Sequence, residues 1–311
     1  MSEKREPDSG LVRREAGWAP TSVGWRRWAF WGARHGPRAF VRWSPPLIGL
    51  AFGAALPAAR HRVLRNLRSM FGRRDALVEA RDVACTFMEF AACLGESLGA
   101  ERPEGRAARY RTRGAERFRE LREGGRGLIL ATAHVGPWDA AARCLGTSRK
   151  ERVMLVMSGE PDDKAESFHD LLRATAGVEV VRVGNHPLDA LPLLAWLKAG
   201  HIAAIQFDRA PRGMDTLKGE LFGRDFRVPR GPFALSALLG VPILPVFASR
   251  EGFFDYRVEV GFPVTLPSGA SVQAQEDAAS FVLRQMESFL RAHPTQWFHF
   301  DDAPASDETK V

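Results

Sequence analysis

The chain has 311 residues, of which 45% are hydrophobic and 26% charged, so it can bury the core of one large domain or two small ones. Lysine and arginine number 44 against 37 aspartates and glutamates, a net charge of +7 that suits anionic lipid headgroups, an acidic carrier protein or nucleic acid. The three cysteines form no C-x-x-C pair and no repeated metal-ligand spacing, which argues against a disulfide framework.

The first 59 residues differ in composition from the rest of the chain. Residues 1–20 are polar and charged and predict a disordered tail. From Gly24 to Trp43, tryptophan and phenylalanine alternate with arginine, a mixture typical of membrane interfaces. Residues 45–57 are apolar but shorter than the roughly 20 residues that a spanning helix needs. We therefore predict that residues 21–59 associate with one leaflet of a membrane; the alternative is an amphipathic helix packed on the domain.

Residues 60–98 show helical spacing of apolar side chains, and residues 101–127 are charged and broken by glycine. From residue 128, short apolar runs alternate with helical patterns. The predicted strands cover residues 128–133, 153–157, 178–183, 202–207, 242–248 and 256–260. The predicted helices cover residues 137–145, 164–175, 186–198, 229–239 and 275–292. This alternation predicts an α/β fold with a mostly parallel sheet flanked by helices, in one domain over residues 60–300 with a tail at 301–311.

Residues 128–139 combine a buried strand, a turn and the start of a helix. The strand ends at His134, Gly136 permits the turn, and Pro137 suits the first helical position. Asp139 then lies in the first helical turn, where its carboxylate can bond one imidazole nitrogen of His134 and leave the other free as a base. A helix-capping aspartate beside a loop histidine explains an isolated H-x-x-x-x-D as well. The position at the carboxyl end of a strand, where open α/β sheets place their sites, favours catalysis.

A histidine base of this kind can deprotonate a hydroxyl as it attacks an acyl thioester, without a serine nucleophile. The sequence has no G-x-S-x-G elbow, no H-E-x-x-H, no Cys/His cluster, no G-x-G-x-x-G and no P-loop. We therefore predict direct transfer with no catalytic metal and no bound cofactor.

Several further segments match the motifs of one family in their expected order. They read R-V-L-R-N-L at 62–67, L-F-G-R at 221–224, P-R-G-P at 229–232, G-V-P-I-L-P-V at 240–246 and H-P-T-Q-W-F at 293–298. With the H-x-x-x-x-D motif, this order resembles the lysophospholipid acyltransferase superfamily, and within it the lipid A late acyltransferases. The lipid A enzymes usually read H-x-G-N-W-E, whereas Pro137 and Asp139 stand here for Asn and Glu. The closing H-R-R-F is also replaced, by His-Phe-Asp-Asp at 299–302.

The resemblance, together with the residue types, suggests a substrate site formed by residues after the catalytic motif. Arg173, Arg209 and Arg230 are candidates for binding phosphates of the acceptor or of the carrier's pantetheine arm, because a guanidinium grips two phosphate oxygens at once. Solvated arginines are the alternative in such an arginine-rich chain. Asp208 ends a strand and either orients one of these arginines, touches the acceptor or caps the next element. Gly231 opens a helix whose backbone N–H groups can hold an oxyanion or a phosphate.

The resemblance implies an acyltransferase in which His134 is the general base and Asp139 its partner. It would move a fatty acyl chain from acyl carrier protein or acyl-coenzyme A to a hydroxyl or amine of a membrane glycolipid or lipid A-like acceptor. The implied location is the cytoplasmic face of the inner membrane, as a peripheral or monotopic protein. The alternative is a non-catalytic lipid-binding protein of the same fold; nucleic-acid binding has only the net charge in its support.

Overall fold

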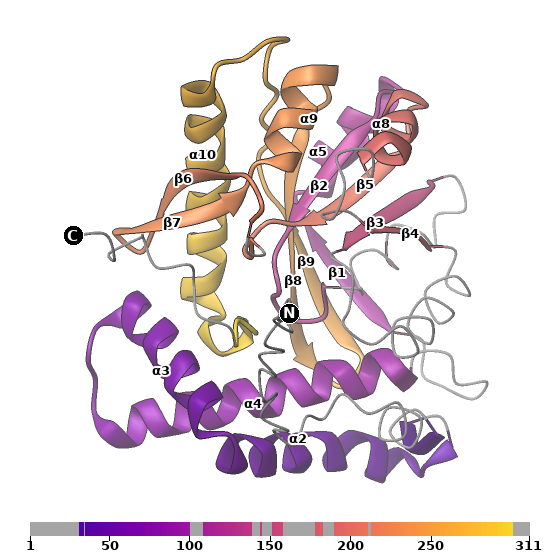
Figure 1. Ribbon diagram of the computed structural model, residues 1–311. Helices are drawn as coiled ribbons and strands as arrows, with labels where there is room; N and C mark the ends of the chain where they lie inside the picture. The colour runs from indigo at the N-terminus through magenta and orange to yellow at the C-terminus, as the bar shows by residue number, and fades with distance from the viewer. Residues whose placement is uncertain are drawn as a thin grey trace, which may run out of the picture.

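The computed structural model describes residues 31–33, 35–99, 108–138, 144, 151–157, 178–182, 190–210 and 213–300. These residues form a seven-stranded sheet with helices on both faces (Figure 1). Every neighbouring pair of strands is parallel except β8 with β9, so the predicted mostly parallel α/β sheet is confirmed. In spatial order the strands are β1 (Arg109–Arg113), β9 (Asp255–Val260), β8 (Ile243–Gly252), β2 (Leu128–Thr132), β5 (Ile202–Gln206), β3 (Val153–Met157) and β4 (Val178–Arg182).

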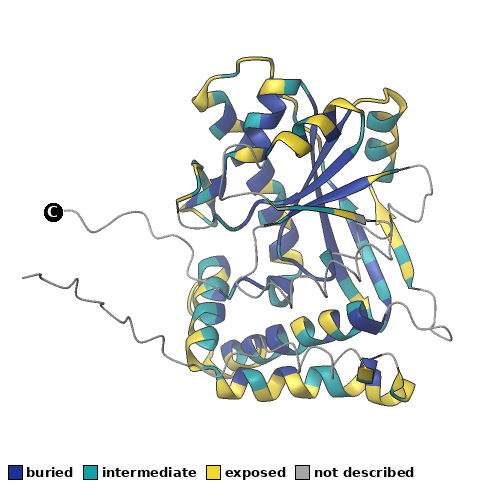
Figure 2. Ribbon diagram, turned by 45° about the vertical axis from the view of Figure 1, so that its right-hand side comes forward, coloured by how far each residue is buried: buried dark blue, intermediate teal, exposed yellow. Residues whose placement is uncertain are grey.

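Two hydrophobic cores lie on opposite faces of this sheet. In β2, Ile129 and Ala131 point into the larger core, while Leu128 and Leu130 point into the smaller one, as the two-residue period of a strand requires. The central strands are buried on both faces, which explains their continuous apolar sequences (Figure 2). Helix α5 (Ala115–Glu123) covers the smaller core. The larger core is covered by α8 (Leu191–Lys198), α9 (Gly231–Leu239), α10 (Val272–Ala292) and the antiparallel hairpin of β6 (Thr216–Leu221) and β7 (Arg224–Pro229).

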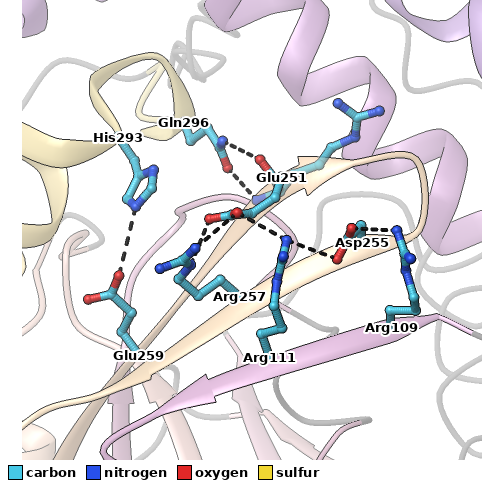
Figure 3. Close-up of polar contacts among 9 residues, drawn as sticks. Arg109, Arg111, Glu251, Asp255, Arg257, Glu259, His293 and Gln296 are labelled. Carbon is cyan, nitrogen blue, oxygen red and sulfur yellow. Dashed lines mark hydrogen bonds and ion pairs between the residues drawn. The ribbon is translucent and has the colours of Figure 1, made fainter.

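Strand β1 lies in the charged stretch where no strand was predicted. Its sequence is polar and almost wholly exposed, because it forms the edge of the sheet and pairs only with β9. Arg109 and Arg111 bond Asp255, and Arg111 and Arg257 bond Glu251 (Figure 3). Charged side chains along an edge strand discourage pairing with another chain. The same charges remove the apolar alternation by which a strand is predicted.

Three helices lie together beyond the carboxyl ends of the central strands (Figure 1): α2 (Arg38–Ala55), α3 (Pro57–Phe71) and α4 (Ala76–Gly99). Helices α2 and α4 pack closely because Gly49 and Gly53 face α4. A Cβ at Gly49 would lie 2.3 Å from the carbonyl oxygen of Phe87, and one at Gly53 would lie 2.9 Å from the Phe87 ring. None of the described helices is by itself long and apolar enough to cross a membrane; α2 and α3 reach that length only as a pair bent by 100°.

The buried carboxylate of Glu96 ties α4 to the sheet. It accepts hydrogen bonds from Nε of Arg250 at 2.8 Å, from the hydroxyl of Tyr256 at 2.7 Å and from the backbone N–H of Phe254 at 3.1 Å. Burial raises the pKa of Glu96, although Arg250, Tyr256 and the Phe254 N–H all stabilise the charged form. Arg250 also reaches the more exposed Glu89, at 3.3 Å. Glu96 therefore fixes the position of α4 relative to β8 and β9.

Replacing Glu96 by alanine should destabilise the fold strongly, because it leaves the buried guanidinium of Arg250 with one distant carboxylate. We expect a loss of about 3–5 kcal/mol in the free energy of unfolding, measured by urea denaturation at neutral pH. The matched control is Glu89→Ala, which removes the longer and more exposed contact with the same arginine and should cost about 1 kcal/mol or less. Equal losses in the two variants would contradict this role of Glu96.

Candidate active site

His134 and Asp208 meet at the carboxyl ends of two adjacent parallel strands. Strands β2 and β5 pair in a register that sets Thr132 opposite Gln206, the last residue of each strand. Each member of the pair follows its strand by two residues, so the sheet brings together side chains that are 74 residues apart in the chain. Asp208 is fully buried, and the His134 side chain is partly exposed.

The contacts between the two side chains fix the imidazole. Nδ1 of His134 lies 2.8 Å from Oδ1 of Asp208, and the backbone N–H of His134 lies 3.1 Å from both carboxylate oxygens. Because a carboxylate can only accept, Nδ1 carries a proton, and in the neutral imidazole Nε2 is then the nitrogen with the lone pair. Among the described residues, none bonds Nε2. The arrangement therefore presents a base with one orientation and one tautomer.

The surroundings of Asp208 keep its carboxylate charged. Burial alone would raise the pKa of Asp208, but the charge and the hydrogen bond of His134, with smaller contributions from His299 and Arg209, hold it well below its usual range. A carboxylate that accepts several hydrogen bonds is favoured in its charged form. Asp208 is thus ionised at neutral pH and can stabilise an imidazolium at His134.

The segment that follows α10 closes over the histidine turn. This segment begins with the 3-10 helix η2 (Pro294–Gln296). The next residue, Trp297, pairs with Val135 of the histidine turn in an antiparallel bridge. The N–H of Phe298 donates to the carbonyl of His134 at 2.8 Å, and the N–H of Gly136 donates to the carbonyl of Gln296 at 2.8 Å. The indole N–H of Trp297 donates to Oδ2 of Asp208 at 3.1 Å. This segment therefore holds both the histidine and its carboxylate.

The side chain of Gln296 anchors the same segment to β8. Its amide oxygen accepts from the backbone N–H of Arg250 at 2.8 Å, and its amide nitrogen donates to the Arg250 carbonyl at 2.9 Å (Figure 3). On the other side, Asn66 of α3 donates to the carbonyl of His299 at 2.8 Å, and the rings of Phe90 and Phe298 pack 5.3 Å apart. The candidate site therefore lies between the sheet and the helices α3 and α4.

The other predicted site residues are distributed more widely. Asp139 and Arg173 lie outside the described residues. Arg209 follows Asp208 directly, and its guanidinium donates to the carbonyl of Phe298, so it belongs to the candidate site. Arg230 and Gly231 lie instead at the start of α9.

At the start of α9, Arg230 is engaged by other residues of the fold. Its guanidinium donates to Oε1 of Gln275 at 3.0 Å and to Oδ2 of Asp215 at 2.9 Å. Gly231 has open space where a Cβ would be. Among the described contacts, none joins either residue to His134.

Two polar side chains at the end of β2 and β5 have an atom without a partner. The hydroxyl oxygen of Thr132 and the amide nitrogen of Gln206 are buried and make no hydrogen bond. Buried polar atoms are nearly always bonded, so each of these two atoms can still form a hydrogen bond at the edge of the sheet that carries His134 and Asp208.

No three histidine, cysteine, aspartate or glutamate side chains within the described part of the chain are placed to hold a metal ion. The imidazole of His134, bonded to the buried carboxylate of Asp208, can accept and return a proton.

Comparison with known proteins gives a family for this geometry. The family model described as bacterial lipid A biosynthesis acyltransferase matches residues 23–302, which is most of the chain. The match confirms the resemblance read from the sequence motifs. No curated protein matches the chain.

Replacing Gly136 by alanine should disrupt the histidine turn. Gly136 has a φ of +46°, and a Cβ there would lie 2.3 Å from the carbonyl oxygen of Ala248 and 2.9 Å from Oε1 of Gln296. We expect a loss of about 2–4 kcal/mol in unfolding free energy, from positive-φ strain and displacement of the backbone. The control Gly231→Ala has open space and should change stability by about 0.5 kcal/mol or less. A Gly136→Ala variant as stable as wild type in urea would show that the turn is not constrained in this way.

Proposed function

We propose that this chain, which belongs to the bacterial lipid A biosynthesis acyltransferase family, transfers a fatty acyl group from a thioester donor to a hydroxyl or amine of a membrane glycolipid. Family membership makes the chain an acyltransferase that uses an acyl donor and a lipid acceptor. The observation that carries the proposal is the imidazole of His134, which is bonded through Nδ1 to the buried Asp208 and whose Nε2 is bonded by none of the residues that the structure describes.

In the proposed reaction His134 acts first as a base and then as an acid. Nε2 takes the proton from the acceptor hydroxyl as the hydroxyl oxygen bonds to the thioester carbonyl carbon. Asp208 stabilises the imidazolium that forms, as the aspartate does in serine-protease triads. When the tetrahedral intermediate collapses, the carbon–sulfur bond breaks and the imidazolium returns the proton to the leaving thiolate. The products are an acyl ester and a free thiol, and His134 is again neutral.

The proposal retains the other residues expected from the sequence. Asp139, the carboxylate of the H-x-x-x-x-D motif, is proposed as a partner of the His134 imidazole beside Asp208. Arg173, Arg209, Arg230 and Gly231 are proposed to bind phosphates of the acceptor or of the donor, which is acyl carrier protein or acyl-coenzyme A. Arg209 has the strongest support among them, since it is bonded to Phe298 beside the histidine turn.

Substituting His134 by alanine should abolish transfer. The assay supplies labelled acyl-coenzyme A and acyl carrier protein thioesters with extracted inner-membrane lipids. We expect wild type to form a labelled lipid and the variant to be about 10²–10⁴-fold slower, the range that general acid–base catalysis contributes. Circular dichroism checks that the variant is folded. Equal transfer rates of wild type and variant, or no transfer by wild type with any donor, would contradict the mechanism and favour a lipid-binding protein.

We further propose that the outer face of α2 lies on the membrane. Trp43, Leu47 and Leu50 are exposed side chains of α2. The exposed residues of this helix lie mainly on its outer side (Figure 2). Arg42 is exposed on the same helix, with its guanidinium 4.9 Å from the Trp43 ring centre. Exposed tryptophan, leucine and arginine side chains on one helix suit a surface of anionic lipid. We propose that this surface is the cytoplasmic face of the inner membrane, next to the lipid acceptor.

A charge placed on this face should weaken lipid binding. Leu47 is 63% exposed, and Leu238, on α9, is 62% exposed. We expect Leu47→Glu to reduce binding to phosphatidylglycerol vesicles at least tenfold, since a buried leucine contributes about 1.5–3 kcal/mol and glutamate adds repulsion. Leu238→Glu adds the same charge elsewhere and should bind as wild type does. Vesicle sedimentation measures both, and equal binding by the two variants would contradict this orientation.

A further inference from the structure

The carboxylate of Asp208 is held from two sides. Its Oδ1 accepts from Nδ1 of His134 at 2.8 Å. Its Oδ2 accepts from the indole N–H of Trp297 at 3.1 Å, and the backbone N–H of His134 lies 3.1 Å from each oxygen. The indole therefore bonds the oxygen that the imidazole does not use, which prevents the carboxylate from rotating away from the imidazole.

Trp297 has little freedom to leave this position. Its side chain is 5% exposed and belongs to the larger core of the sheet. Its ring centre lies 5.1 Å from that of His299, 6.2 Å from that of Phe222 and 6.5 Å from that of Phe226. The backbone bridge to Val135 fixes the residue to the histidine turn as well. The indole N–H is thus a preorganised donor.

We propose that Trp297 is a positioning residue of the acyl transfer reaction, whose indole N–H orients the Asp208 carboxylate and limits how strongly that carboxylate attracts the imidazole proton. The kinetic part of this inference rests on the proposed function. A hydrogen bond to a charged group is among the stronger ones in proteins. Without it, Oδ2 loses a donor while Oδ1 stays bonded to Nδ1, so more of the negative charge acts on His134, with His299 and Arg209 as the smaller charged neighbours. His134 then holds a proton more tightly, so the neutral base forms only at higher pH.

The chain contains a matched tryptophan for comparison. Trp196 is 8% exposed and lies in the same core, and its indole N–H donates to the carbonyl of Ile202 at 2.8 Å. Trp196 makes no described contact with His134 or Asp208. Trp196→Phe therefore removes an indole and a buried hydrogen bond without touching the site. Comparing the two variants therefore distinguishes a positioning role of Trp297 from a general loss of core packing.

The test uses the full-length protein as wild type, Trp297→Phe and Trp196→Phe. The pH dependence of kcat and KM is measured for acyl transfer, and ¹⁵N-histidine NMR follows the titration of His134. We expect Trp297→Phe to lower kcat about tenfold with KM within about twofold, the pattern of an interaction that acts in the transition state. The acid limb of its rate profile and the His134 midpoint should both move to higher pH. Trp196→Phe should leave both where wild type has them.

An unchanged rate profile and His134 midpoint in Trp297→Phe would overturn the inference, and so would equal shifts in Trp196→Phe. If wild type shows no transfer, the proposed function fails, whereas the NMR midpoint still tests the link from Trp297 to His134. A third measurement needs no substitution at Trp297. In wild type, the indole ¹H–¹⁵N signal of Trp297 should follow the titration of the His134 ¹⁵N signals, whereas that of Trp196, whose ring centre lies 4.5 Å from that of His201, should not follow the His134 midpoint. A Trp297 signal that stays constant through the His134 titration would also overturn the inference.

Discussion

The fully buried carboxylate of Asp208 imposes a constraint on the structure around it. A buried charge costs free energy unless hydrogen bonds compensate it, and here the donors come from two parts of the chain. The acceptor, Asp208, follows β5. One set of donors is the backbone N–H and the imidazole of His134, which follows β2, and the other donor is the indole of Trp297, in the segment after α10. The sheet order that places β5 beside β2, and the return of the chain after α10, are therefore both conditions for a charged Asp208 at this position.

Helix α4 connects this polar site with the apolar surface of α2. On one side Glu96 bonds β8 and β9, and Phe90 packs on Phe298 beside the histidine turn. On the other side α2 packs closely on α4 through Gly49 and Gly53, and its large apolar side chains are left pointing outward. Helix α4 therefore sets the distance between the exposed apolar side chains of α2 and the imidazole of His134.

The central strands could be predicted from the sequence, whereas the contact of His134 with Asp208 could not. Strands buried on both faces have continuous apolar sequences, so β2, β3, β5 and β8 were predicted within a few residues, whereas the charged edge strand β1 and the hairpin β6–β7 carry no such signal. The H-x-x-x-x-D spacing is local and pointed to His134. The contact between His134 and Asp208 depends on the register of β2 with β5. The contact between Trp297 and Asp208 depends on the bridge between Trp297 and Val135. Both pairings join segments far apart in the chain, so local sequence patterns do not predict them.

The central claim is that Asp208 holds His134 in the tautomer and charge state that acyl transfer needs. Asparagine at position 208 preserves the volume but cannot compensate the charge of an imidazolium, and its amide nitrogen can donate to Nδ1 and so reverse the tautomer. The most direct measurement is kcat/KM of Asp208→Asn with a thioester donor, in a protein shown to be folded. The account predicts a fall of about 10³–10⁴-fold, as in enzymes where a buried aspartate serves a catalytic histidine. A rate within tenfold of wild type would contradict it.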